Sequence, residues 1–147
     1  MSAAASTDTP RTQRLRDFLS AAGTLGTLRF VAVSPGVVLE TIGRLDYSTS
    51  TFAVPGRGHF LSVASEDRLF ECHINTDEVQ AVSLSQEPAK VGAHDVYVMR
   101  FLGEHDKRLL SCMLMWDPSQ GPGHYLADAV QRFTELRERH NGRFTLC

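Results

Sequence analysis

The amino-acid sequence predicts an α+β domain in which a large antiparallel β-sheet is flanked by an N-terminal and a C-terminal helix. About seven short runs rich in β-branched and aromatic residues follow one another between residues 28 and 116, separated by turn residues. Apolar residues at helical spacing occur before and after these runs. We therefore expect residues 1–10 to be disordered and residues 11–147 to form one domain.

The two helices are predicted by their apolar stripes. Between Arg11 and Ala22, apolar side chains recur at i, i+3, i+4 and i+7, and Gly23 follows as a stop. The second stripe begins at Tyr125 and ends near His140, before an Asn-Gly pair. Each stripe suits a helix packed on one face of a sheet.

The strands are predicted in hairpin order. They are expected at residues 28–33, 37–42, 60–63, 68–74, 79–85, 95–102 and 107–116, with a short edge segment at 144–147. Residues 46–58 are rich in Ser, Thr, Pro and Gly, which predicts a loop.

Several of these strands are apolar on both faces, most clearly residues 107–116 and 97–101. Two helices cover about one face of a sheet of this size, so the second face must meet a ligand, another subunit, or both. A homodimer formed through the sheet is the partner that this pattern predicts.

Composition excludes several classes of function. The 147 residues carry a formal net charge of -2, and a charge of this sign and size does not indicate a nucleic-acid partner. No apolar run is long enough to span a membrane, and the first residues do not resemble a secretory signal. The three cysteines are an odd number without CxxC spacing, which predicts reduced thiols in a cytoplasmic protein.

The six histidines are scattered and form no zinc pattern, and no nucleophile or nucleotide-binding motif is present. We therefore predict no catalytic residue. His73 differs from the other histidines because it lies in mid-strand, where Phe70, Cys72 and Ile74 alternate with Glu71 and His73. A neutral imidazole there could bind haem iron, with apolar side chains of the second face shielding the porphyrin. The candidates for that shield are Tyr97, Val98, Met113 and Met115.

The segment Phe70–Val82, with its Phe-x-x-His-Ile strand and acidic turn, resembles the cytosolic haem-utilisation carriers of the ChuX/HutX type, which are like single halves of HemS-like proteins. The early hairpin at 33–45, Glu87-Pro88, the hairpin through residues 99–103 and the closing helix follow the same layout, so the resemblance covers most of residues 25–140. It implies a homodimer that binds haem, with His73 matching the strand histidine of the family. At the early-hairpin position where such proteins can carry another histidine, this chain has Ser34, and His59 is a substitute to consider.

The function expected is haem carriage rather than enzymatic turnover. Arg57, Arg68 and Arg100 are candidates to bind the haem propionates, because a guanidinium pairs well with a carboxylate. One alternative is reductant-driven haem breakdown, as implied by HemS-like relatives. Another is an interaction dimer without haem, in which His73 is simply a satisfied histidine.

Overall fold

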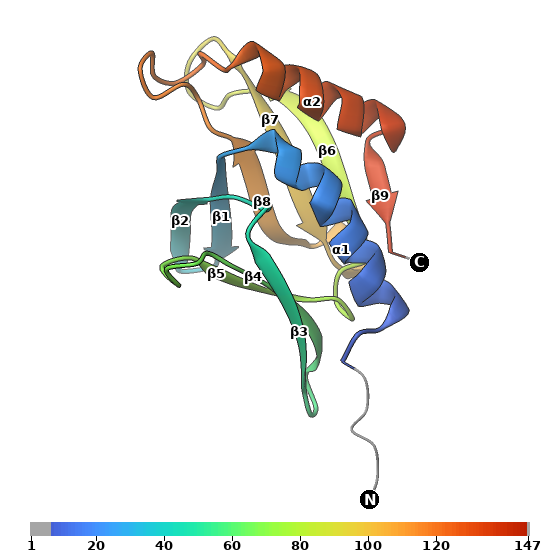
Figure 1. Ribbon diagram of the computed structural model, residues 1–147. Helices are drawn as coiled ribbons and strands as arrows, with labels where there is room; N and C mark the ends of the chain where they lie inside the picture. Colours follow the sequence, from blue (N-terminus) through green and yellow to red (C-terminus); the bar gives the residue numbers. More distant parts are fainter. Residues whose placement is uncertain (1–6, 147) are drawn as a thin grey trace, which may run out of the picture.

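Nine strands and two α-helices make up the computed structural model, which describes residues 7–146 (Figure 1). A six-stranded antiparallel sheet has the order β2 (Val37–Gly43), β1 (Leu28–Ser34), β8 (Arg108–Leu114), β7 (Asp95–Leu102), β6 (Ala81–Pro88), β9 (Arg143–Thr145). A three-stranded antiparallel sheet has the order β3 (Ser48–Val54), β4 (Gly58–Ala64), β5 (Glu71–Asn75). The helices are α1 (Pro10–Ala22) and α2 (Ala127–Arg139).

The predicted fold class is confirmed, but the strands divide between two sheets instead of forming one. After β2 the chain bends at residues 44–47, where Arg44 is paired with Asp46 at 2.8 Å and Leu45 is buried. Because of this bend β3 does not continue the first sheet. It begins a second one, which lies below the first in Figure 1.

The prediction of a loop over residues 46–58 was wrong for its central part, which forms β3. The run Ser-Thr-Ser-Thr-Phe-Ala-Val is polar, but its threonines are β-branched and suit a pleated strand. Phe52 stacks on Phe60 of the neighbouring strand, with ring centroids 5.1 Å apart. Only the Pro55–Arg57 segment forms the turn that its composition predicts, closed by a 2.9 Å bond from Arg57 N to Val54 O.

The helix α1 is defined at both ends by local chemistry. Thr9 caps its first turn through a reciprocal capping box with Thr12, and Pro10 occupies the position where a missing N–H costs nothing. Gly23 ends the helix and begins a 3-10 turn, Gly23–Leu25. Thr7, just before the helix, is bonded to Thr51 of β3 at 2.7 Å, so this end of the helix is attached to the smaller sheet.

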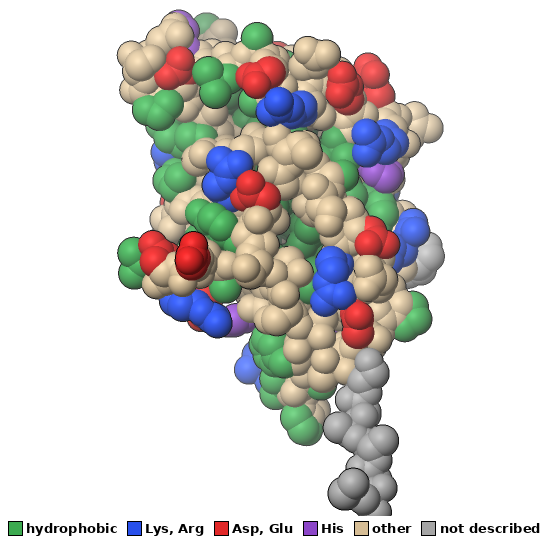
Figure 2. Space-filling model, in the orientation of Figure 1, with side chains coloured by type: hydrophobic (Ala, Val, Ile, Leu, Met, Phe, Trp, Pro, Cys, Tyr) green, Lys and Arg blue, Asp and Glu red, His purple; other side chains and the backbone are tan. Residues whose placement is uncertain are grey.

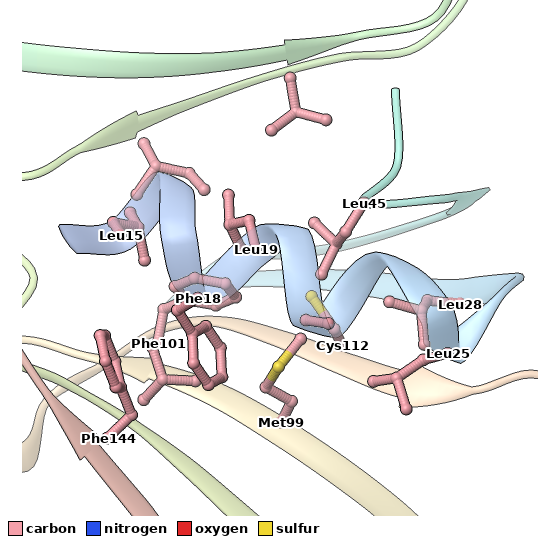
Figure 3. Packing of buried hydrophobic residues seen from close by; sticks show 14 of the residues in the cluster. Leu15, Phe18, Leu19, Leu25, Leu28, Leu45, Met99, Phe101, Cys112 and Phe144 are labelled. Carbon is pink, nitrogen blue, oxygen red and sulfur yellow. The ribbon is translucent and has the colours of Figure 1, made fainter. Parts of the chain in front are cut away.

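The apolar stripe of α1 packs between the sheets. Phe18 stacks on Phe144 of β9 at 4.5 Å, beside Met99 and Phe101 of β7 (Figure 3). On the same sheet face, Tyr97 meets Phe133 of α2 edge-to-face at 5.5 Å. Both helices therefore cover one face of the six-stranded sheet, as the two stripes predicted.

The opposite face of the six-stranded sheet is less apolar than predicted. Arg29 of β1 pairs with Glu40 of β2 at 3.1 Å and lies over the Trp116 ring at 4.5 Å. Arg100 of β7 pairs with Glu87 of β6. The face is thus partly covered by long charged side chains whose methylene groups shield the strands beneath.

Candidate functional site

His73 lies in β5 on the outer face of the three-stranded sheet, opposite Ser62 of β4. Its Nδ1 is 2.7 Å from Ser62 Oγ, and its side chain is 45% exposed. Within residues 7–146, Nε2 makes no hydrogen bond, since its nearest carboxylate oxygen, on Glu71, is 3.9 Å away. One ring nitrogen is therefore anchored in the sheet, while the other is accessible to a ligand.

Two aromatic side chains share this outer face. The rings of Phe52 and Phe60 are nearly parallel, with an interplanar angle of 4°. Phe52 also meets the His73 imidazole edge-to-face, at 5.3 Å and 84°. Both rings are half-buried, so the imidazole stands beside an apolar surface that solvent partly reaches.

The pattern of this surface follows from strand alternation. Ser50, Phe52, Phe60, Ser62 and His73 are brought to one face by the registers of β3, β4 and β5. The other face carries Leu61, Val63 and Ile74, which are buried in the core. The alternation predicted around His73 is confirmed.

Arg68 is the predicted arginine closest to His73 in the sequence. It lies in the β4–β5 turn with a positive φ of 63°, and its guanidinium pairs with Glu71 at 2.9 Å. Glu71 and His73 lie two residues apart on the same strand face. Arg68, Glu71 and His73 therefore follow one another from the β4–β5 turn into β5, with the Arg68–Glu71 ion pair beside the imidazole.

Arg57 and His59 are placed at the other end of β4. Arg57 is exposed in the β3–β4 turn. His59 pairs in register with Ala53, which puts it on the face opposite His73. There its Nδ1 is 2.9 Å from Asp77, and the pKa of that carboxyl is lowered by the hydrogen bond from His59. His59 is therefore not positioned as a second ligand on the His73 face.

Arg100 and Met113 belong to the six-stranded sheet, where they share the face opposite the helices. Arg100 is 14% exposed and bound to Glu87, and Val98 beside it is buried. Tyr97 points to the helix side and contacts Phe133. The side chains expected to shield the porphyrin thus lie on two different faces of the six-stranded sheet, and His73 belongs to the other sheet.

Three residues of the site were missed by sequence reasoning: Phe52, Phe60 and Ser62. The available signal was a pair of runs, 48–54 and 58–64, in which Ser50 and Phe52 of the first run and Phe60 and Ser62 of the second run are each two residues apart. Treating the first run as a loop hid this pattern, because the alternation has meaning only when both runs are strands.

A groove lies apart from this face, between β2 and the β4–β5 turn. Its volume is about 860 Å³. Its lining combines apolar and acidic or hydroxyl side chains, namely Thr41, Ile42, Tyr47, Ser65, Glu66, Asp67, Leu69 and Phe70. It contains no histidine, so it offers no nitrogen ligand to a metal.

The rest of the described chain shows no candidate metal centre. Among residues 7–146 there is no cluster of three or more His, Cys, Asp or Glu side chains able to hold a metal ion. No helix in that range is long and apolar enough to cross a membrane. Figure 2 shows acidic and basic side chains interspersed on the face it displays, with no extended basic surface.

Comparison with known proteins supports the fold. The chain matches no protein-family model, and no curated protein sequence matches it. It superposes on the haem-binding protein ChuX over 87% of this chain and 73% of that one, with a TM-score of 0.66 and 17% identity. This chain has the ChuX-like fold.

The ChuX-like fold extends to further structures. A protein from Agrobacterium tumefaciens matches over 87% of this chain and 67% of that one, with a TM-score of 0.67 and 15% identity. The haem oxygenase ChuS from E. coli matches over 85% of this chain but 35% of its own length, with a TM-score of 0.59 and 13% identity. The chain therefore corresponds to about a third of ChuS, and identities this low establish a shared fold alone.

Proposed function

We propose that this protein binds haem in the cytoplasm and carries it, with His73 Nε2 as the ligand of the iron. The observation that carries the proposal is the His73 imidazole, which is held at Nδ1 by Ser62 and leaves Nε2 on an exposed face. A neutral imidazole with one anchored nitrogen is the usual form of a histidine that binds a metal. Haem binding by ChuX, on the same fold, supports this ligand class.

The aromatic side chains suit a flat ligand. The Phe52 ring meets the His73 imidazole edge-to-face, at 5.3 Å and 84°, and the parallel Phe60 ring stacks on Phe52. These two rings would offer apolar contact to a porphyrin macrocycle held by His73. Of the predicted arginines, we assign Arg68 to a propionate, because it lies in the turn that leads into β5 and its ion pair with Glu71 is exposed to solvent. Arg57 lies at the opposite end of the sheet, in the β3–β4 turn, and is not assigned a propionate.

Arg100 and Met113 are not part of this proposal. Arg100 is already engaged by Glu87, and both residues lie in the six-stranded sheet. Cytoplasmic location is supported by the unpaired state of Cys72 and Cys112, since a reducing compartment keeps thiols free.

We further propose that the protein is a homodimer and that the β1–β2 hairpin belongs to its interface. Val33, Val37, Val38 and Leu39 are 61–69% exposed at the tip of this hairpin. In the described chain β2 is an edge strand, and Glu40 is its one charged residue. Edge strands are usually protected by charges, prolines or bulges, so an apolar edge of this kind suits pairing with a second copy.

A hemin titration followed through the Soret band tests the haem proposal. Wild-type protein should give a saturable band that His73→Ala loses or shifts. His59→Ala is the matched control, because His59 is on the opposite face and bonded to Asp77. A band of equal intensity and affinity in the His73→Ala protein would refute the assignment.

Haem breakdown is the second candidate function, supported by the likeness to the haem oxygenase ChuS. It predicts that haem bound to His73 loses its Soret band in the presence of a reductant and oxygen, with release of iron and a linear tetrapyrrole. Carriage predicts a bound haem that is reduced without loss of the macrocycle and then passes to an apo-acceptor.

A further inference from the structure

Ser62 is the polar partner of the His73 ring, and its position is set by the sheet. It is 5% exposed and lies directly opposite His73 in the β4–β5 register. Its Oγ is 2.7 Å from His73 Nδ1, a short distance for a neutral hydrogen bond. A buried hydroxyl held by its own strand can fix the orientation of an exposed imidazole.

A neutral imidazole carries one ring proton, and the position of that proton decides which nitrogen can bind a metal. If the proton is on Nδ1, the ring donates it to Ser62 Oγ, and the lone pair of Nε2 faces outward. If the proton is on Nε2, the Nδ1 lone pair accepts a hydrogen bond from the Ser62 hydroxyl, and no lone pair faces outward. Only the first arrangement presents a ligand on the exposed face.

We propose that Ser62 is the positioning residue of this site, accepting the Nδ1 proton of His73 and so directing the Nε2 lone pair to the haem iron. The proposal rests on the proposed haem function, and it adds the group that selects the binding tautomer. A hydrogen bond from Nδ1–H also makes the imidazole a stronger donor to the metal, as partners of ligating histidines do in general.

The chain supplies matched variants. Ser62→Ala removes the acceptor, and Ser62→Thr keeps the hydroxyl on a strand residue. Ser50→Ala is the control, because Ser50 lies opposite Ser62 across the β3–β4 pair, on the same face, with no hydrogen bond to His73 in the described chain. Removing a partner of a metal ligand typically weakens metal binding by about 10–100-fold.

The first measurement is the 15N spectrum of the His73 ring in haem-free protein, at a pH where the ring is neutral. The expected result is the Nδ1–H tautomer in wild type, Ser62→Thr and Ser50→Ala, with a gain of Nε2–H in Ser62→Ala. An Nε2–H tautomer in wild type would overturn the inference, regardless of the affinity measured for hemin.

The second measurement is the hemin affinity and the iron–histidine stretching band of the reduced complex. Ser62→Ala should bind hemin about 10-fold or more weakly and shift this band to lower frequency, while Ser62→Thr restores both. A His73-dependent Soret band with the same affinity and stretching frequency in Ser62→Ala would remove Ser62 from the site and leave the haem proposal standing. A Soret band that is the same in wild type and in His73→Ala would instead refute the haem proposal. The 15N spectrum would still show whether Ser62 selects the tautomer of His73.

Discussion

The ring of Phe70 lies against the backbone of Gly43, so closely that a Cβ atom at Gly43 would stand 2.5 Å from the ring. Gly43 ends β2, and Phe70 precedes β5, so this contact joins the two sheets. Phe70 also packs on Phe30 at 4.8 Å and on Tyr47 at 5.6 Å. The missing side chain at Gly43 is therefore what allows the aromatic junction between the sheets.

Gly43→Ala should destabilise the protein by about 1–3 kcal/mol, because the added methyl group overpacks a buried junction. The free energy of unfolding in urea measures this. Gly36→Ala, at the hairpin tip where nothing lies within 4 Å, is the control and should stay within about 0.5 kcal/mol of wild type. Equal stability of the two variants would contradict the role given to the junction.

The Glu87–Arg100 pair should make stability depend on pH at the acid end. The pKa of Glu87 is lowered from 4.5 to about 2, first by the hydrogen bond from Arg100 and then by that from Ser85. Because the folded pKa is the lower one, the stabilisation is complete above about pH 4.5 and is lost as pH falls toward 2.

Glu87→Gln should remove this component of the pH dependence and should also lower stability at pH 7, since it leaves Arg100 without its carboxylate. Urea unfolding between pH 2 and pH 7 measures both effects. Glu138→Gln, at an exposed position of α2, removes the same charge and serves as the control. Parallel pH profiles for wild type and Glu87→Gln would show that the pair is not the cause.

Val38→Lys should convert a dimer into a monomer while leaving the fold intact. Val38 is 61% exposed, so the substitution disturbs little packing within one copy but places a charge on the apolar edge. Sedimentation velocity at tens of micromolar measures the mass. Val91→Lys, 86% exposed in the β6–β7 connection, should remain dimeric, and a monomeric wild-type protein would exclude the proposed interface.

Phe52→Ala should weaken hemin binding by several-fold, since an aromatic contact contributes about 0.5–1.5 kcal/mol beyond its buried area. Val54→Ala is the control, because Val54 lies two residues further along the same strand face, next to the β3–β4 turn and opposite Gly58. Soret titrations of the two variants measure the difference. An unchanged hemin affinity in Phe52→Ala would show that haem does not contact the aromatic pair.

Cys72 should react slowly with iodoacetamide in the folded protein. Burial raises the pKa of its thiol from 9.0 to about 11, so at pH 8 the reactive thiolate is about 100-fold scarcer than for an ordinary cysteine. A Cys147→Ser background isolates Cys72 and Cys112, and mass spectrometry follows the labelling. Fast modification of Cys72 at pH 8, as in the urea-unfolded protein, would contradict its burial.

The sequence by itself determined the helices, most strands and the side of the strand on which His73 stands. These follow from local periodicity: the stripe from Leu15 to Ala22 is buried as its spacing required, and Phe70 and Ile74 are buried while His73 is exposed. Periodicity is a property of neighbouring residues, so it can be recognised in a short segment without knowing how the rest of the chain folds.

Only the tertiary structure decided which strands share a sheet, and with that which residues meet. Arg100 and Met113 were predicted to lie near His73 because a single sheet would place all three on its uncovered face, but the bend at residues 44–47 places them in different sheets. Ser62 and Phe52 became partners of His73 through the cross-strand registers of β3, β4 and β5. Register depends on pairing between segments that are distant in sequence, and the residues of one strand do not specify which other strand it pairs with.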